Sequence, residues 1–89
     1  MLQVEEYIEK LNEVLRQIKN YFDVAKMHES GVASFIFCEK GIRSIEIYQS
    51  EDSIVIEFWM NEELQTEKEV NSYEKAAKLA VEWVNKYEN

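Results

Sequence analysis

The chain has little of the residue types that loops, redox centres and metal sites use. Its 89 residues include no proline, one cysteine, one histidine and two glycines. Cys38 alone can form neither an internal disulfide nor a multi-cysteine zinc site, and a single free cysteine favours a reducing, cytoplasmic setting. With only Gly31 and Gly41, the chain can build neither a phosphate-binding loop nor a dinucleotide fingerprint.

Long apolar runs are also missing. The longest, 35–38, has four residues, whereas a membrane-spanning helix needs about 20. The first eleven residues contain three glutamates and lack the basic and apolar regions of a secretory signal. We therefore expect a cytoplasmic protein in which residues 1–89 form a single domain, because a chain of this size supports one core.

Positive charge is in short supply. The chain has 18 acidic and 10 basic residues, for a net charge of −8, and residues 28–71 hold 10 of the acids but 3 of the bases. This balance opposes binding to nucleic acid or to an anionic membrane. A field of one sign steers basic partners. The same charges also give solubility and protect strand edges, and the sequence leaves both interpretations open.

The N-terminal apolar residues repeat at alternate spacings of four and three, which predicts an amphipathic helix over residues 4–25. A coiled-coil seam has similar spacing, but the wider apolar stripe favours a helix lying on a sheet. Gly31 is expected to follow the helix end, and His28 to interact with the helix dipole. The stripe comprises Val4, Ile8, Leu11, Leu15, Ile18, Phe22 and Ala25.

Four strands are predicted after this helix, at 32–38, 42–49, 54–60 and 64–70. A three-residue turn, 39–41, is expected to join the first two strands, with Gly41 in the left-handed conformation. The fourth strand is polar and suits a sheet edge. A second helix is expected to begin after Asn71 or Ser72, with Glu74 completing a capping box.

The predicted fold is α+β, a two-layer sandwich of order αββββα. Because the connections are short, the four strands form an antiparallel meander, and the N- and C-terminal helices cover one of its faces. The side chains expected beneath the helices are Ala33, Phe35, Phe37, Ile45, Ile47, Ile54, Ile56, Phe58 and Met60. Those expected on the uncovered face are Ser34, Ile36, Cys38, Ser44, Glu46, Tyr48, Val55, Glu57, Trp59, Gln65, Glu67 and Glu69.

This uncovered face is the candidate binding surface. Tyr48 and Trp59 are the predicted anchors, because aromatic side chains dominate the energetics of interfaces. The surrounding carboxylates are expected to set orientation and association rate. They are Glu46, Glu57, Glu67 and Glu69. The alternative is an ordinary half-solvated sheet, on which scattered apolar residues are normal.

The sequence offers no catalytic residue, metal ligand set or cofactor motif. Pairing His28 with Cys38 would need an orienting group and an oxyanion site that no spacing indicates. Glu5, Glu9 and Glu13 share one helix face but lack the histidines of a carboxylate metal site. The rival hypothesis is a small-molecule-binding or catalytic domain with a cleft near Cys38, Tyr48 and Trp59.

In size, acidity and bare helix-flanked sheet, the chain is similar to phage or mobile-element inhibitors that mimic nucleic acid, and to immunity proteins that neutralise a basic toxin. The resemblance covers the whole chain and rests on physical character rather than on a motif. It implies a non-enzymatic interaction module that binds a basic protein surface, or a second copy of itself, through the uncovered sheet face. We expect no cofactor, because the sequence has no cofactor motif, and no direct contact with nucleic acid or membrane, because the net charge is −8.

Overall fold

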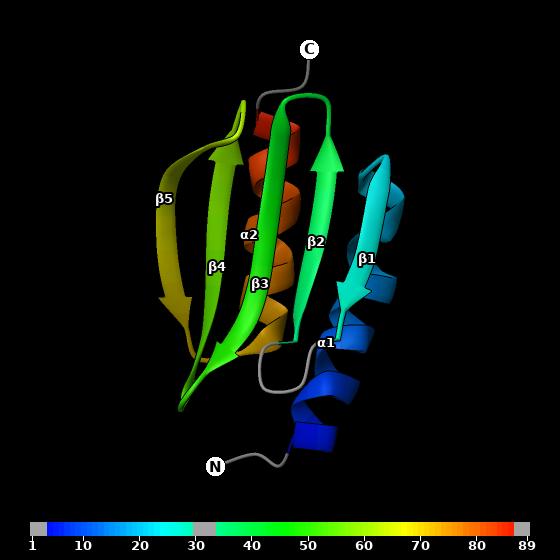
Figure 1. The fold of residues 1–89 in the computed structure, drawn as a ribbon, viewed down its shortest axis with the longest axis vertical. Coiled ribbons are helices and arrows are strands. Elements are labelled where there is room, and N and C mark those ends of the chain that lie inside the picture. Colours follow the sequence, from blue (N-terminus) through cyan, green and yellow to red (C-terminus); the bar gives the residue numbers. More distant parts are fainter. Residues whose placement is uncertain (1–3, 30–33, 87–89) are drawn as a thin grey trace.

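The structure, a computed structural model, describes residues 4–29 and 34–86 and has an α+β fold. Within these ranges two α-helices and one 3₁₀ turn accompany a sheet of five strands (Figure 1). In chain order the elements are α1 (Val4–Ile18), η1 (Lys19–Tyr21), β1 (Val24–His28), β2 (Phe35–Lys40), β3 (Arg43–Ser50), β4 (Ser53–Met60), β5 (Glu63–Val70) and α2 (Tyr73–Lys86).

The five strands form a simple meander. Their order across the sheet is β1-β2-β3-β4-β5, and every neighbouring pair is antiparallel. Both helices lie on one face of the sheet (Figure 1), and they contact each other along the middle of that face. The α+β class, the antiparallel meander and the placement of the helices were predicted from the sequence, whereas the number of strands was not.

The additional strand, β1, begins within the last residues of the segment that was predicted to be helical. α1 ends at Ile18, and Phe22 has extended dihedral angles. The backbone N–H of Asp23 then donates to the carbonyl of Glu39, 2.9 Å away, at the start of the pairing with β2. The predicted helix over 4–25 is therefore too long, and His28 lies on a strand rather than beside a helix end.

The face assignment of β2 was also wrong. The predicted three-residue turn would put Phe35 opposite Ile45, beneath the helices. The turn instead has two residues, because Lys40 pairs directly with Arg43, and this puts Cys38 opposite Ile45 and Ile36 opposite Ile47. The register thus differs by three residues from the predicted one, and a change by an odd number of residues exchanges the two faces of a strand. Ile36 and Cys38 are consequently fully buried, while Phe35 and Phe37 point away from the helices.

The core lies between the helices and the inner face of the sheet. α1 contributes Leu11, Val14 and Ile18. From α2 come small residues that allow close approach to the sheet, and the Trp83 and Phe58 rings lie 5.2 Å apart. The buried residues of the inner sheet face are Ile36, Cys38, Ile45, Ile47, Ile54, Ile56 and Phe58, Ser34 is buried just before β2, and those of α2 are Ala76, Ala77, Ala80 and Val84. Val55, which was predicted for the uncovered face, is also buried. The predicted inward set is thus correct for β3 and, except for half-buried Met60, for β4. Ala33 lies outside the described residues.

α2 begins with a side-chain cap. The Ser72 hydroxyl accepts a hydrogen bond from the backbone N–H of Lys75 at 3.1 Å. Of the two cap candidates, Ser72 is therefore the one used, and Lys75 rather than Glu74 occupies the third helical position, where a capping box needs an acid or amide. Neither α1 nor α2, the two α-helices described, is long and apolar enough to cross a membrane.

Candidate functional site

The face of the sheet turned away from the helices, called here the open face, is built by alternate residues of all five strands. The register brings Lys26, Phe37, Glu46, Glu57 and Glu67 into one line across β1 to β5, each directly opposite the next. Directly opposite side chains on neighbouring strands have Cβ atoms about 5 Å apart. The acidic segment 28–71, with 10 acids and 3 bases, therefore places three carboxylates side by side on adjacent strands.

We call Glu46, Glu57 and Glu67 the acidic row. Like charges directly opposite each other destabilise a sheet, and here both neighbouring pairs in the row are like-charged. Packing does not require this arrangement, because the register places the three side chains on the face away from the core. The helices leave this face of the sheet uncovered (Figure 1). The row is therefore a local cost in folding free energy that a cationic partner would relieve.

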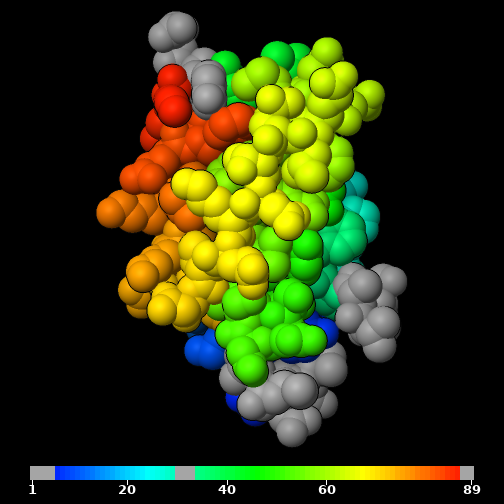
Figure 2. Space-filling view, turned by 90° about the vertical axis from the view of Figure 1, so that its left-hand side faces the viewer, coloured from blue at the N-terminus to red at the C-terminus, as the bar shows by residue number. Residues whose placement is uncertain are grey.

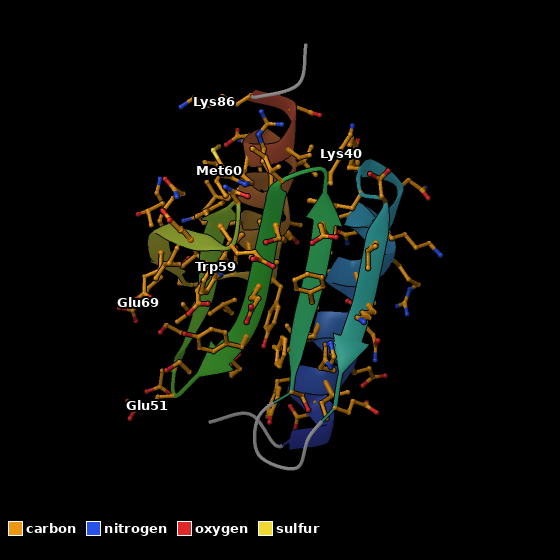
Figure 3. All side chains as sticks on the ribbon, turned by 45° about the horizontal axis from the view of Figure 1, so that its top comes forward. Lys40, Glu51, Trp59, Met60, Glu69 and Lys86 are labelled. Carbon is orange, nitrogen blue, oxygen red and sulfur yellow. The ribbon has the colours of Figure 1, made fainter. Side chains whose placement is uncertain are left out.

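Tyr48 and Trp59 flank the central carboxylate of the row. The Tyr48 hydroxyl donates to Glu57 Oε2 at 3.2 Å, and the Trp59 indole N–H donates to Glu57 Oε1, also at 3.2 Å. Both aromatic side chains are half-buried. Each oxygen of one carboxylate thus holds one aromatic side chain, so the two predicted anchors are fixed relative to each other. Figure 3 shows Trp59 on the open face of the sheet.

The surroundings of Glu46 and Tyr48 oppose the ionisation of both side chains. Burial first, and then the neighbouring Glu57, raise the pKa of Glu46, while His28 acts in the opposite direction. Burial and the charge of Glu57 raise the pKa of the Tyr48 hydroxyl to about 12. Tyr48 therefore stays a neutral hydrogen-bond donor at physiological pH, and cannot serve as a base.

Glu69 belongs to the same face but lies apart from the acidic row. It pairs with Val55, and one of its carboxylate oxygens accepts a hydrogen bond from the Ser53 hydroxyl at 2.7 Å. Figure 3 places Glu69 at the β5 side of the sheet. The structure thus puts all six predicted binding residues on the open face and brings four of them, Tyr48, Trp59, Glu46 and Glu57, into one cluster.

The sequence-based assignment missed the part of the face contributed by β1 and β2. Phe35 pairs with Tyr48, and the His28 and Phe35 rings stack with centroids 4.9 Å apart. Phe37 lies between Lys26 and Glu46. The sequence signal in this region was residues 35–38, FIFC. Both alternating sets, Phe35 with Phe37 and Ile36 with Cys38, are apolar, so alternation alone could not decide which set faces the core. The open face is consequently more aromatic than predicted, and β1 adds Lys26 to it.

No protein-family model, curated protein or solved structure matches this chain. Its function is therefore argued from the chemistry of the open face and of the pockets beside it.

The rival cleft near Cys38, Tyr48 and Trp59 is not assembled. Cys38 is fully buried under the helices, whereas Tyr48 and Trp59 lie on the opposite face. Burial raises the pKa of the Cys38 thiol to about 12. Because the thiolate is the reactive form of cysteine, this thiol is inert at neutral pH.

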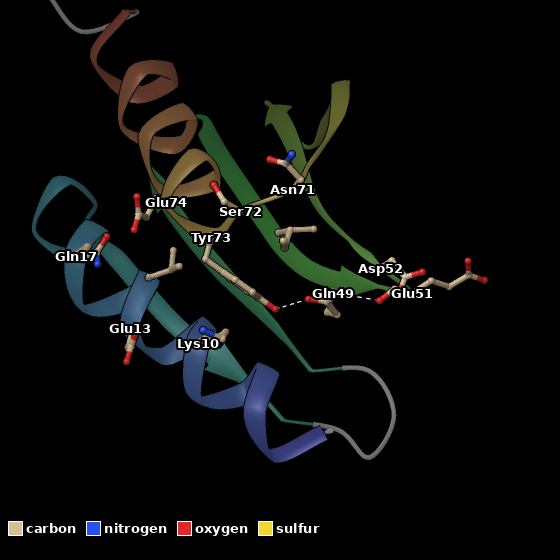
Figure 4. A pocket seen from close by; sticks show the side chains of 12 residues that line it. Lys10, Glu13, Gln17, Gln49, Glu51, Asp52, Asn71, Ser72, Tyr73 and Glu74 are labelled. Carbon is tan, nitrogen blue, oxygen red and sulfur yellow. Dashed lines mark hydrogen bonds between the residues drawn. The ribbon is translucent and has the colours of Figure 1, made fainter. Parts of the chain in front are cut away.

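A pocket of about 560 Å³ lies between α1 and the beginning of α2 (Figure 4). Tyr73 donates a hydrogen bond to the Gln49 side-chain oxygen there, and the Gln49 amide donates to the carbonyl of Glu51 at 2.8 Å. Burial raises the pKa of Tyr73 to about 12, so it acts as a donor. Lys10 and Glu13, three residues apart on α1, also line this pocket.

Metal binding finds no support in the described part of the chain, where no group of three or more His, Cys, Asp or Glu side chains is placed to hold an ion. The acidic row extends along a line across three strands, whereas metal ligands converge on one point. This geometry suits contact with several cationic groups spread over a surface.

Proposed function

We propose that this protein is a small, acidic, non-enzymatic interaction module that binds a basic protein surface through its open sheet face. One observation carries the proposal. Glu57 fixes Tyr48 and Trp59 on either side of itself in the middle of the acidic row, on the face that no helix covers. Fixed aromatic side chains lose little conformational entropy on binding, which is the property of an interface anchor.

The carboxylates and the aromatic side chains have different roles in this proposal. Desolvated aromatic anchors near the centre of an interface supply most of the binding free energy. Charges around them accelerate encounter and exclude partners of the same sign. A partner carrying Arg or Lys opposite Glu46 and Glu67 would relieve the repulsion along the row, and its guanidinium groups could stack on Tyr48 or Trp59.

A basic partner is favoured over a second copy of the chain. Two open faces brought together would each present an acidic row to the other, and repulsion between like charges in an interface is costly. An inhibitor, an immunity-type protein or a nucleic-acid mimic would each use such a surface against a basic target. The single buried cysteine fits our inference of a cytoplasmic setting.

The proposal is tested with nitrogen-15-labelled protein titrated with folded basic proteins, namely lysozyme, ribonuclease A and cytochrome c. We expect chemical-shift changes concentrated on β3 and β4 around Tyr48 and Trp59, with affinity that falls as salt rises. Trp59→Ala should weaken binding by about tenfold or more, as truncation of a hot spot does.

Two double variants that remove the same charge separate a specific face from net charge alone. Glu46→Gln/Glu67→Gln neutralises the ends of the acidic row, whereas Glu13→Gln/Glu82→Gln neutralises two exposed acids on the helices. We expect only the first pair to slow association substantially. Equal effects of the two double variants, or shift changes spread over the helices, would show that the open face is not the binding site.

A further inference from the structure

β5 is an edge strand with a bare outer side. It pairs with β4, and β5 is the last strand in the sheet formed by the described residues. Residues 63–69 are all exposed. Figure 2 looks onto this edge and shows β5, in yellow, uncovered along its length, with α2 in orange and red beside it. An edge of this kind offers backbone N–H and C=O groups to an incoming strand.

The two edge strands of the sheet, β1 and β5, differ in how readily another strand can pair with them. β1 has five residues and lies against α1, whereas β5 has eight and no proline. A register shift beside Trp59 interrupts the start of β5, but residues 66–70 pair regularly with β4. Proline is a common protection against added strands, and β5 has none. The protections that β5 does have are the register shift and its charged side chains, and acidic side chains repel an acidic segment but not a basic one.

The direction of the free backbone groups follows from the register. The two-residue turn between Ser50 and Ser53 makes them a hydrogen-bonded pair, and such pairs alternate along antiparallel strands. Glu57 therefore bonds to β3, and Ile56 and Phe58 bond to β5. This leaves the N–H and C=O groups of Glu67 and Glu69 directed outward. The residues with free backbone groups are thus those whose carboxylates lie on the open face.

The two sides of β5 present different chemistry to an added strand. On the open face, Glu67 ends the acidic row and Glu69 follows two residues later. On the helix side, a pocket of about 300 Å³ lies between β5 and α2, and its lining combines Phe58, Leu79 and Trp83 with the charged Lys68, Glu82 and Lys86. A strand paired with β5 would therefore meet carboxylates on one side and a hollow lined by both apolar and charged side chains on the other.

We propose that β5 accepts an extended segment of a basic partner as a sixth strand, with Arg or Lys opposite Glu67 and Glu69 and an apolar residue between them facing α2. This rests on the proposed function, because it states how the basic partner attaches to the acidic face. A second copy is a poorer occupant. If β5 of two copies paired antiparallel, with the open faces of both copies on the same side of the joined sheet, Glu67 and Glu69 of each copy would lie against those of the other.

The test uses an acetylated, amidated octapeptide of alternating arginine and valine, titrated into the full nitrogen-15-labelled chain. We expect shift changes along β5 and the facing turns of α2, and weaker binding by a peptide with the same composition in two blocks. Glu67→Gln and Glu67→Pro each remove one charge, but only proline removes the outward N–H. Because that N–H is not used by β4, the sheet should tolerate proline at this position.

We expect the affinity to fall about threefold in Glu67→Gln and about tenfold further in Glu67→Pro, the range for loss of one hydrogen bond and disturbance of its neighbours. A peptide that is N-methylated at the amides facing β5 should also fail to bind the unmodified chain, which keeps the test independent of the folding of the proline variant.

Other outcomes overturn the inference in distinguishable ways. Equal binding to the glutamine and proline variants, combined with loss of binding in Trp59→Ala, would refute docking at β5 and retain the open face as the site. Absence of peptide binding together with equal effects of the two double variants would refute both proposals. A dimer of the chain alone that Glu67→Pro dissociates would show that a second copy occupies this edge.

Discussion

Glu46 is a residue whose charge suits the proposed binding of a basic partner but destabilises the folded protein. It is half-buried, faces Glu57 on one side and Phe37 on the other, and has a raised pKa caused first by burial. A carboxyl group whose pKa is higher in the folded state than in the unfolded state binds its proton more tightly when folded. Its ionised form therefore lowers the stability of the protein at neutral pH.

The pH dependence of stability follows from this sign. As pH falls from neutral through the folded-state pKa of Glu46, the folded state gains its proton first, and the contribution of this residue to stability rises until the pH reaches the unfolded-state pKa. We predict that Glu46→Gln is more stable than the natural protein at pH 7 and gains less between pH 7 and pH 5. Urea denaturation at both pH values measures this, and Glu13→Gln controls for the loss of one charge.

If Glu46→Gln and Glu13→Gln shifted the unfolding midpoint equally at pH 7 and kept the same slope with pH, then Glu46 would bear no local electrostatic cost. The acidic row would in that case be no more costly than the rest of the acidic surface.

The face of the sheet on which a residue lies was predictable where polar and apolar residues alternate along the strand, because the polar residues then mark the open face. In β4 the carboxylate of Glu57 marks the open side, and this also places Trp59 correctly. In β2 both phases are apolar, and Cys38 was assigned to the wrong face. The contact between Glu57 and both anchors could not be foreseen, because it depends on side-chain rotamers as well as register.

At the scale of elements, the turns determined which predictions succeeded. The strands after Gly41 were located within a few residues. The turn before β3 has two residues instead of the predicted three, however, and this exchanges the two faces of β2. The stretch 22–28 was misassigned because Phe22 and Ala25 fit helical spacing, while Ala25 and Met27 also fit the alternation of a half-covered strand. Pairing with β2, a contact between residues distant in sequence, decides between the helical and the extended conformation.

The turn between β4 and β5 provides a test at this scale. Both of its central residues have positive φ, 52° at Asn61 and 66° at Glu62. This favours Asn-Gly over Asn-Glu, because glycine adopts that conformation without strain. We predict that Glu62→Gly raises the free energy of unfolding by about 0.5 to 1 kcal/mol, measured by chemical denaturation.

Glu63→Gly is the matched control, since it removes the same charge from the next residue, which lies in a strand. Glycine within a strand should destabilise the protein. Stabilisation by both changes would attribute the effect to charge rather than to backbone conformation.

At the scale of the whole molecule, the dominant property is an acidic surface concentrated on one face of a sheet. Salt shortens the range of repulsion, from a Debye length of about 30 Å at 0.01 M to a few Å near 0.5 M. We predict that this increase in sodium chloride raises the free energy of unfolding by about 1 kcal/mol, given two like-charged pairs in the row. Glu46→Gln/Glu67→Gln should show a clearly smaller rise than Glu13→Gln/Glu82→Gln in thermal denaturation.

The consecutive order of the strands has a consequence for the time course of folding. Each strand pairs with its neighbour in sequence, so the sheet can grow hairpin by hairpin with short loops to close. α1 lies over β1 to β3 and α2 over β3 to β5. During synthesis, the first half of the sheet can collapse onto α1 as soon as it leaves the ribosome. The inner face of β4 and β5 stays exposed to water until α2 emerges and docks against α1, so completion of the core waits for the synthesis of α2.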